Sequence, residues 1–401
     1  SAPGGPAPAP TRAVGAIGLR VAVAAVTRFA LRVLYAPLRL LPRRRKVVMI
    51  SREHPTVPED FRAVAEGLRR TDPTIEVVTM VRMVPPGLIG KLGYAAHMLH
   101  QLFHVATARV LVIDTYTIVA SVLRHGPELT VIQMWHALGA LKKFGLSILD
   151  QAEGRDARLA HAMRMHEGYD LVLASAEAAR APFAEALGTP VADVAVAPLP
   201  RVDRLRDPAW QQQRRAEILA AHPHLAERPV ALFAPTFRLD GGVLIDAAAL
   251  GTALEALGFQ TVVKLHPLMA GHFGPSVDTA DGFSTQDLML VADIFLTDYS
   301  SALFEAAVVG VPGVFVAPDL DEYLTSRDFY LDYRTDLPGP VTRDIASAAA
   351  AVADIASDRA EAVARTEAFA RRWVEVPESE SATPCTDRIV ALIVEAVDAS
   401  R

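Results

Sequence analysis

The chain has 401 residues, of which 51% are apolar and 21% charged, a composition that indicates a globular protein long enough for two domains. Its single cysteine, Cys385, excludes an internal disulfide framework and a cysteine-based metal finger, and fits a reducing compartment. The net charge of −6 is unevenly distributed, because residues 1–46 hold eight arginines and one lysine but no acidic residue. The remainder is acidic, so we expect no nucleic-acid partner.

The first 45 residues form an arm of two parts. Residues 1–12 are rich in alanine, proline and glycine and are predicted to be disordered. Residues 13–45 are predicted to form an amphipathic, basic helix, because an aliphatic face lies opposite four arginines that share one third of the helix circumference: Arg20, Arg28, Arg32 and Arg39. This pattern is typical of a helix in a membrane interface whose arginines reach the lipid headgroups. The alternative is an ordinary amphipathic helix packed on the protein body.

Beyond the arm, apolar runs rich in β-branched residues alternate with helical patterns. In the first half we expect strands at 46–51, 75–81, 110–114, 130–134 and 171–174, with helices at 60–68, 88–107 and 177–187. After a break near 198–208 the pattern restarts with strands at 230–234 and 261–265 and a helix at 247–257. Such alternation is typical of parallel sheets buried on both faces.

Two successive halves of this kind predict an α/β protein with two Rossmann-like domains and a cleft between them, an architecture of the GT-B type. We assign residues 46–205 to an N-terminal Rossmann-like domain and residues 206–345 to a C-terminal one. Residues 346–401 are predicted to be C-terminal helices. The sequence leaves open whether the last helix returns to the first domain.

The most informative segment is 293–318, where a short buried strand at 294–297 leads through Asp298-Tyr299-Ser300-Ser301 into a helix at 302–309 and a strand at 313–316. Free backbone N–H groups and the helix dipole make the start of a helix an anion site, and ligands of open α/β sheets lie beyond the carboxyl ends of strands. We therefore predict a site for a phosphate-bearing ligand at Thr297, Asp298, Ser300 and Ser301. The alternative is plain N-capping by the serine pair.

Further blocks accompany this segment in a fixed order. They are Trp135-His136 with the following residues to 145, Pro200-Arg201-Val202-Asp203, Ala234-Pro235-Thr236-Phe237-Arg238, Lys264-Leu265-His266-Pro267, the serine pair, and the stretches 319–323, 327–333 and 338–340. In order and spacing, these blocks resemble the CDP-glycerol glycerophosphotransferases, the teichoic acid primases and polymerases. The resemblance covers roughly residues 46–345, and it implies that the N-terminal domain holds the acceptor and the C-terminal domain holds the CDP-linked donor.

Two histidines carry the predicted chemistry. His136 follows a strand, and an imidazole there is a fair general base because its pKa lies near the working pH; the alternative is a core histidine beside Trp135. The resemblance implies that His136 is the catalytic base and that His266 is the second essential histidine. The family usually continues Gly-Thr-Pro after this histidine, whereas residues 137–139 read Ala-Leu-Gly here. This departure affects the geometry of the loop and its acceptor contacts.

Four basic residues are candidates for binding anionic groups. Arg238 ends a strand-end block and Arg201 lies at the presumed hinge, and a guanidinium can bind two phosphate oxygens at once. Lys142 is predicted to attract the anionic acceptor, with a solvated basic turn as the alternative. Arg327 is a further candidate for a phosphate or acceptor contact. No P-loop, GxGxxG or paired-aspartate motif follows a strand, so we expect transfer without a metal or another cofactor.

The resemblance implies transfer of glycerol phosphate from CDP-glycerol to a lipid-linked teichoic-acid or capsule-like acceptor, with release of CMP. It implies a peripheral protein at the cytoplasmic face of the cell membrane, in contact with an anionic lipid surface. Use of CDP-ribitol, a nucleotide-sugar glycosyltransferase of the same fold and a non-catalytic cell-wall scaffold are the alternatives. The motifs do not distinguish glycerol from ribitol, or a primase from a polymerase.

Overall fold

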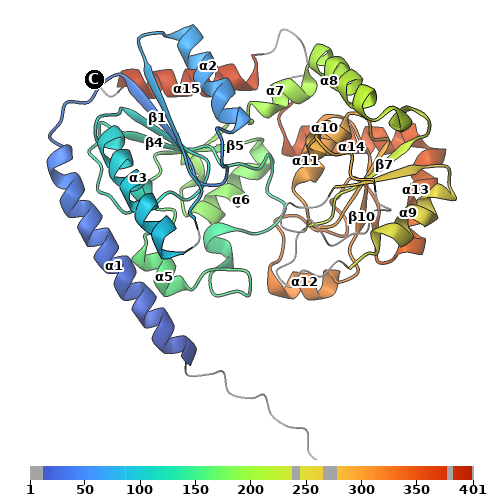
Figure 1. Ribbon diagram of the computed structural model, residues 1–401, viewed down its shortest axis with the longest axis horizontal. Helices are drawn as coiled ribbons and strands as arrows, with labels where there is room; N and C mark the ends of the chain where they lie inside the picture. Colours follow the sequence, from blue (N-terminus) through green and yellow to red (C-terminus); the bar gives the residue numbers. More distant parts are fainter. Residues whose placement is uncertain (1–11, 86, 237–243, 265–277, 377–382, 400–401) are drawn as a thin grey trace, which may run out of the picture.

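The computed structural model describes residues 12–85, 87–236, 244–264, 278–376 and 383–399. They form two α/β lobes that lie side by side, with a long N-terminal helix along the outer side of the first lobe (Figure 1). Each lobe is built around one parallel sheet. The predicted α/β architecture with parallel sheets is therefore confirmed. The domain limits given above stay predictions.

The first sheet has six strands in the order β2-β1-β3-β4-β5-β6, and all the pairings are parallel. Its strands are β1 (Lys46–Ser51), β2 (Glu76–Val81), β3 (Val110–Ile113), β4 (Thr130–Gln133), β5 (Leu171–Ala174) and β6 (Val194–Val196). Every residue of β1 and β3 is buried, as expected of strands covered by helices on both faces. The short β6 was not predicted, because three residues carry too little pattern to stand out.

The second sheet has five parallel strands in the order β11-β10-β9-β7-β8. They are β7 (Val230–Phe233), β8 (Gln260–Val263), β9 (Ile294–Thr297), β10 (Gly313–Val316) and β11 (Val341–Thr342). The strands β7, β9 and β10 are buried along their whole length. Both sheets thus have the same doubly wound pattern, in which the chain moves first to one side of the starting strand and then to the other.

Helices cover both sheets. They are α1 (Arg12–Leu38), α2 (Glu59–Thr71), α3 (Leu88–Ala106), α4 (Ile118–Ser121), α5 (Ala157–Ala162), α6 (Glu177–Leu187), α7 (Arg201–Arg206), α8 (Pro208–Ala221), α9 (Ala247–Glu255), α10 (Thr285–Met289), α11 (Ala302–Val308), α12 (Leu320–Ser326), α13 (Ile345–Ser357), α14 (Arg359–Trp373) and α15 (Cys385–Ala399). Short 3-10 turns lie at Gly145–Ile148, Val191–Asp193 and Pro223–Ala226.

The C-terminal helices tie the two lobes together. Helix α13 packs against α9 and β10 of the second lobe, and α14 contacts both α11 and α6. Helix α15 then returns to the first lobe, where it packs on α2, β1 and β3 (Figure 1). Asp203 fixes the start of α15 by accepting hydrogen bonds from the backbone N–H groups of Cys385 and Thr386 at 2.7 and 2.8 Å. The question left open by the sequence is thus settled, since the chain crosses back.

Helix α1 packs on α3 and α5 through the face that was predicted to meet lipid headgroups. Arg28 donates to the carbonyl of Ala162 at 2.9 Å, and Arg32 donates to the carbonyl of Val122 at 2.8 Å. The predicted outward direction of these two arginines is therefore wrong, because main-chain carbonyls of the body satisfy their guanidinium groups. The opposite, aliphatic face is exposed. Among the described helices, none combines the length and apolar character needed to cross a bilayer.

Candidate functional site

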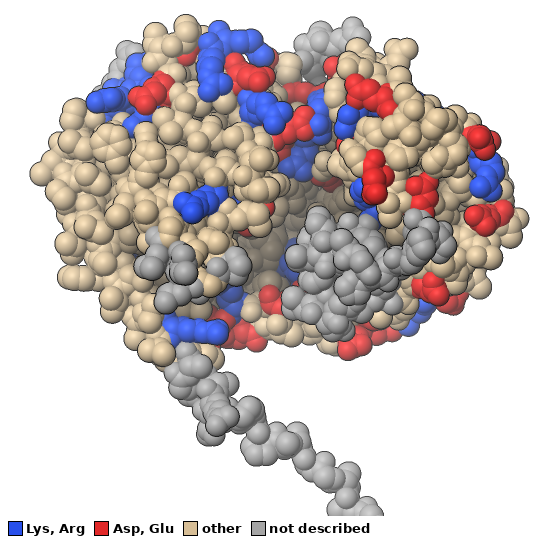
Figure 2. Space-filling view, in the orientation of Figure 1, with Lys and Arg blue, Asp and Glu red and all other residues tan. Residues whose placement is uncertain are grey.

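The surface is hollowed between the two lobes (Figure 2), and the segment that follows β4 pairs with the second lobe through a bridge between Lys142 and Phe329. In the first sheet the connections change direction between β1 and β3, and in the second sheet between β7 and β9. Ligands of doubly wound sheets bind at such switch points, beyond the carboxyl ends of the strands. A ligand site is therefore expected along the segments that follow β1, β3 and β4 in the first lobe, and those that follow β7 and β9 in the second.

His136 lies beyond β4, beside the switch point of the first sheet. Its Nδ1 is 2.9 Å from the main-chain oxygen of Asp114, the residue that follows β3. A carbonyl oxygen accepts only, so Nδ1 carries the proton and donates it, which leaves the lone pair on Nε2. This arrangement fixes the tautomer that a general base requires.

The surroundings of His136 keep its imidazole neutral. Burial lowers the pKa of His136, the Asp114 carbonyl and the Glu53 carboxylate act in the opposite direction, and the charges of Arg201 and His54 lower it further. A lowered pKa keeps the lone pair free at neutral pH, which is the state needed to accept a proton. The structure thus brings together groups from β1, β3, β4 and the hinge around the predicted base.

Trp135 is held in a backbone conformation that non-glycine residues rarely adopt, with φ at 61°. Its N–H donates to the side-chain oxygen of the buried Gln133 at 2.9 Å. Its indole ring stacks between His136 and Phe144, with ring centroids 4.4 and 4.6 Å apart. Backbone strain that the surroundings maintain in this way is concentrated at functional sites. The stacked rings hold the imidazole in one orientation.

Asp114 is a candidate site residue that was not among the residues predicted from the sequence. Its side chain is buried, and Oδ1 has no hydrogen-bond partner among the described residues. Burial, together with the nearby carboxylates of Glu53 and Asp60, raises the pKa of Asp114 to about 7. The signal was present in the sequence, because Asp114 is the last residue of the strand predicted at 110–114. The rule that selected His136 therefore selects Asp114 as well.

Thr297 and Asp298 fasten β9 to the segment that follows β7. The Thr297 hydroxyl donates to the carbonyl of Ala234 at 2.7 Å, and Asp298 accepts from the N–H of Thr236 at 2.7 Å. Both side chains are buried, and the Tyr333 hydroxyl donates to the main-chain oxygen of Asp298 at 2.7 Å. These contacts give the two residues a structural role at the switch point. Their predicted role in ligand binding stays a prediction.

The predicted strand, turn, helix and strand around the serine pair are present as β9, α11 and β10. Ser300 accepts a hydrogen bond from the N–H of Ala302 at 3.2 Å, which is the capping contact given above as the alternative. Ser301 precedes the first residue of α11, and its side chain makes no capping hydrogen bond to the described backbone. The serine pair therefore retains one hydroxyl that capping does not occupy.

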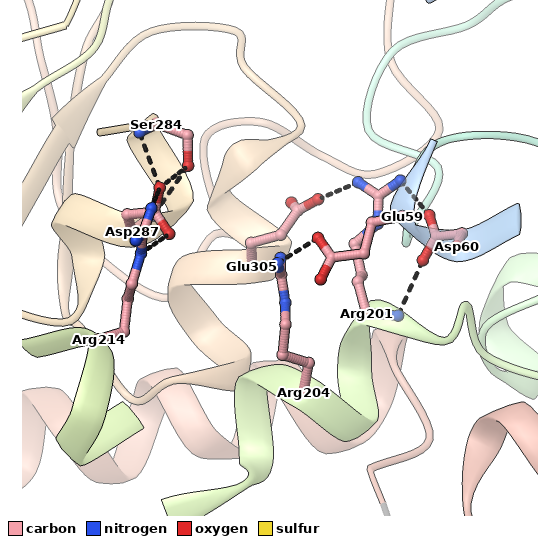
Figure 3. Close-up of polar contacts among 8 residues, drawn as sticks. All are labelled: Glu59, Asp60, Arg201, Arg204, Arg214, Ser284, Asp287 and Glu305. Atoms are coloured by element: carbon pink, nitrogen blue, oxygen red, sulfur yellow. Dashed lines mark hydrogen bonds and ion pairs between the residues drawn. The ribbon is translucent and has the colours of Figure 1, made fainter. Parts of the chain in front are cut away.

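Arg201 lies at the junction of the lobes, between two carboxylates (Figure 3). Its Nε donates to Asp60 at 2.9 Å, and its NH1 donates to Glu305 at 3.1 Å. Asp60 belongs to α2 of the first lobe and Glu305 to α11 of the second. The contacts show a structural link between the lobes, whereas the predicted contact with phosphate stays a prediction.

Lys142 and Arg327 also lie at the contact between the lobes. Lys142 pairs with Phe329 in an antiparallel bridge, and its ammonium group lies 5.8 Å from the centre of the Tyr323 ring. Arg327 donates to the carbonyl of Lys143 at 3.1 Å and forms an ion pair with Glu153 at 2.6 Å. The segments that carry these two predicted residues are therefore in contact. Arg238 and His266 lie outside the described residues.

The model of one protein family matches residues 33–395, nearly the whole chain: CDP-glycerol:poly(glycerophosphate) glycerophosphotransferase. The chain belongs to this family. The prediction from the ordered sequence blocks is thereby confirmed, and the protein is a transferase of the teichoic acid biosynthesis type.

Individual relatives are named for different polyol phosphates. The chain is 33% identical over 364 residues to a teichoic acid ribitol-phosphate primase of Bacillus spizizenii, covering 88% of this chain and 92% of that one. It is 28% identical to a teichoic acid poly(ribitol-phosphate) polymerase of the same organism, covering 77% of this chain but only 51% of the polymerase. It is 25% identical over 62% of its length to a teichoic acid glycerol-phosphate primase of Bacillus subtilis, of which it covers 66%.

Solved structures support the fold. The wall teichoic acid polymerase TagF aligns with a TM-score of 0.71 at 20% identity, covering 95% of this chain and 98% of the TagF chain. A UDP-GlcNAc 2-epimerase from Neisseria meningitidis aligns with a TM-score of 0.56 at 14% identity, covering 87% of this chain and 100% of the epimerase. At these identities the likeness concerns the fold alone, and it agrees with the predicted GT-B-like architecture.

Proposed function

We propose that the protein transfers a polyol phosphate from a CDP-polyol to a hydroxyl of a teichoic-acid-type acceptor, with His136 as the general base. One observation carries the proposal: His136, which follows β4 of the first lobe, is neutral and has a fixed tautomer. The chain belongs to a family of such transferases. A base placed in this way contributes about 10²–10⁴-fold to the rate.

In the proposed reaction, the acceptor hydroxyl gives its proton to Nε2 of His136. Its oxygen then bonds to the phosphorus that carries the polyol, and the bond from that phosphorus to the bridging oxygen of the pyrophosphate breaks, so that CMP leaves. Phosphoryl transfer of this kind relies mostly on positioning and electrostatic stabilisation.

The segment at Ser300 and Ser301, with Arg238, is the proposed contact for the donor phosphates, and His266 is the proposed partner for the departing CMP. Lys142 and Arg327 are proposed to attract the acceptor.

The donor predicted from the sequence is CDP-glycerol, and CDP-ribitol is a second candidate. The relative with 33% identity, covering 88% of this chain, is a ribitol-phosphate primase, whereas the glycerol-phosphate primase reaches 25% identity over 62%. This difference favours ribitol, while the family description favours glycerol. The two donors differ only in the length of the polyol, so one side of the donor site decides between them.

A panel of CDP-polyols separates the candidates. The protein is incubated with CDP-glycerol, CDP-ribitol or a UDP-sugar, each with a primed acceptor, and the release of CMP or UDP is measured. Release of CMP only with CDP-ribitol would replace glycerol by ribitol in the proposal. Release of UDP from the sugar donor alone would replace the proposal by a glycosyltransferase, and no release from any donor would favour a scaffold.

We further propose that the acceptor is lipid-linked and that α1 associates peripherally with the cytoplasmic face of the membrane. Large apolar side chains on α1 support this, since Val26 and Phe29 are 68% and 70% exposed. A helix in the interface buries its apolar face among the acyl chains. Because Arg28 and Arg32 bind the protein body, we expect apolar insertion to contribute more than charge and the salt dependence to be shallow.

Sedimentation with anionic vesicles tests this part of the proposal. The double variant Val26→Ser with Phe29→Ser is expected to sediment less than the unaltered protein, because two inserting side chains become polar. Leu257→Ser is the matched control, since Leu257 is also exposed but lies in the second lobe. Equal sedimentation of all three proteins would mean that α1 serves only as a packed helix.

A further inference from the structure

The loop that carries His136 meets the second lobe at a glycine. Gly139 lies three residues after His136, and a Cβ atom on Gly139 would be 2.4 Å from Cζ and 2.5 Å from Cε1 of Phe304. Unbonded carbon atoms are at their best separation at about 3.5–4.0 Å, so this approach is far too close. Phe304 belongs to α11 of the second lobe. Any side chain at position 139 would therefore push the His136 loop and α11 apart.

Phe304 has no room to withdraw. Its side chain is fully buried and stacks on Phe369 of α14, with the ring centroids 5.5 Å apart and the planes 18° from parallel. The Trp373 ring lies 6.3 Å from the same centroid. Because protein interiors are close-packed, a clash at Gly139 has to be relieved by movement of the loop.

The same loop is also bonded to the second lobe further along. Lys143 donates its backbone N–H to the carbonyl of Asp328 at 3.1 Å, and Tyr330 donates its N–H to the carbonyl of Leu141 at 3.0 Å. The residues after His136 are therefore attached to the second lobe, although β4, which precedes His136, belongs to the first. The position of His136 thus depends on both lobes.

A second joint holds the same helix. Glu305, the neighbour of Phe304, pairs with Arg201, which also binds Asp60 of α2 through Nε and through its backbone N–H (Figure 3). Glu305 and Asp60 are both buried. Consecutive residues of α11 therefore contact the first lobe, one through packing and one through an ion pair.

We propose that Phe304 is a positioning residue of the transfer reaction. Its ring packs against Gly139 and thereby sets the position of the His136 loop relative to the second lobe. The link through Glu305, Arg201 and Asp60 holds α11 in the place that this contact requires. The inference rests on the proposed function, in which His136 acts on a donor bound by the other lobe. A misplacement of about 1 Å between such groups lowers a rate by about 100-fold.

Three variants test the contact: Gly139→Ala, Phe304→Leu and the two combined. We expect Gly139→Ala to lower kcat about 10–100-fold with the KM for the CDP-polyol nearly unchanged, because the base moves and the donor site does not. Phe304→Leu alone is expected to lower kcat only slightly. The combined variant should regain most of the lost kcat, because the smaller side chain makes room for the added methyl group.

Gly251→Ala is the matched control. Gly251 lies on α9, where a Cβ atom would be 3.8 Å from its nearest neighbour, an ordinary contact with Thr261. We expect this variant to keep the kcat of the unaltered protein. A loss of activity in Gly251→Ala equal to that in Gly139→Ala would show that the effect is not specific to the contact with Phe304, and would overturn the inference.

A second readout does not depend on turnover. The pH titration of His136 is followed by NMR and assigned by its loss in His136→Ala. The titratable and charged groups beside His136 are Glu53, His54, Arg201 and Asp114, whose own pKa is about 7, and all four are kept in the variants. When the loop is pushed away from its buried position, the pKa of His136 should rise toward its ordinary value. The combined variant should return it to the lowered value.

The outcomes separate the inference from the proposed function. Absence of CMP release by the unaltered protein would refute the proposed function, while the His136 titrations would still decide on the coupling. An unchanged kcat and titration in Gly139→Ala, or a mere drop in its melting temperature, would refute the positioning role. If Gly139→Ala does not fold, Phe304→Ala takes its place, because the gap it leaves should loosen the loop and raise the pKa of His136. An unchanged titration in Phe304→Ala would also refute the role.

Discussion

The strand ends of the two lobes differ in how the aspartate that follows a central strand is held. Beyond the strands of the first lobe, Asp114 has a buried oxygen without a partner among the described residues, Trp135 has a strained backbone, and burial lowers the pKa of His136. Beyond β9 of the second lobe, Thr297 and Asp298 each form a hydrogen bond to the segment that follows β7, although the buried Thr236 hydroxyl there also has no partner among the described residues.

This difference indicates a division of labour. Buried polar groups without a partner destabilise a fold, and groups with a strongly shifted pKa are concentrated at sites that carry chemistry. A carboxylate that accepts a main-chain hydrogen bond, as Asp298 does, helps to hold the frame in place. We therefore propose that the chemical step takes place at the first lobe and that the second lobe provides the frame for the donor. The following predictions are ordered from the largest expected effect to the smallest.

His136→Ala should have the largest effect. We expect the rate of CMP release in the presence of acceptor to fall at least about 100-fold, because the base is lost. Binding of the CDP-polyol, measured by calorimetry, should stay nearly unchanged, because the base acts on the acceptor hydroxyl. His161→Ala, at an exposed histidine of α5, is the control and should retain full activity. A His136→Ala rate above about one tenth of the normal rate would rule out this assignment.

Ser300→Ala combined with Ser301→Ala should affect binding more than the chemical step. Lost hydrogen bonds to a charged ligand cost about 1–3 kcal/mol, and we expect the affinities for CDP-polyol and CMP to fall accordingly. Arg238→Ala is expected to act in the same direction. Calorimetry checks both variants. Unchanged affinity in the serine variant would move the donor phosphates away from α11.

Asp114→Asn and Asp298→Ala should change stability in opposite directions. The pKa of Asp114 is raised to about 7, so its contribution to stability is present below its unfolded pKa and is lost as pH rises toward 7. Relative to the unaltered protein, Asp114→Asn should therefore gain on the order of 2 kcal/mol in unfolding free energy between pH 5 and pH 8. Asp298→Ala should lose about 1–3 kcal/mol, because the N–H of Thr236 loses its partner.

Urea unfolding at several pH values measures both effects. A parallel pH dependence for Asp114→Asn and the unaltered protein would mean that the Asp114 carboxyl titrates normally. A neutral effect of Asp298→Ala would remove the contrast between the two sets of strand ends, since Asp298 would then contribute no frame.

Removal of metal ions should have the smallest effect. We expect CMP release to continue at the normal rate in excess EDTA, because the proposed step uses His136 and protein donors rather than a metal. An EDTA-treated sample restored with Mg²⁺ serves as the control. Loss of activity in EDTA, followed by recovery with Mg²⁺, would show that the transfer requires the ion.

Much of the fold follows from local patterns in the sequence. Runs of β-branched residues bounded by turn residues identify strands such as β1 and β9, and Gly310 with Pro312 ends α11 near the expected place. The short β6 and helix α8 were not predicted. A three-residue strand has too little pattern to stand out, and α8 is polar over most of its surface.

Only part of the candidate site can be predicted from local patterns in the sequence. His136 follows the strand predicted at 130–134, and the overlooked Asp114 ends the strand predicted at 110–114, so their position at a sheet edge is a consequence of local sequence. The partners of Arg201 are not, because Asp60 and Glu305 lie 141 and 104 positions away along the chain. The sequence marked Arg201 as a cation at a hinge, and only the packing of α2, α7 and α11 gave it two carboxylates.

By itself, then, the amino-acid sequence determined the family, the two parallel sheets and the strand end that holds His136, because these depend on short-range periodicity and on residues adjacent in the chain. The tertiary structure decided which way Arg28 and Arg32 point, that α15 crosses back to the first lobe, and that Gly139 meets Phe304. Contacts of this kind join segments far apart in the chain. They depend on how helices and loops of both lobes pack together, which no local pattern encodes.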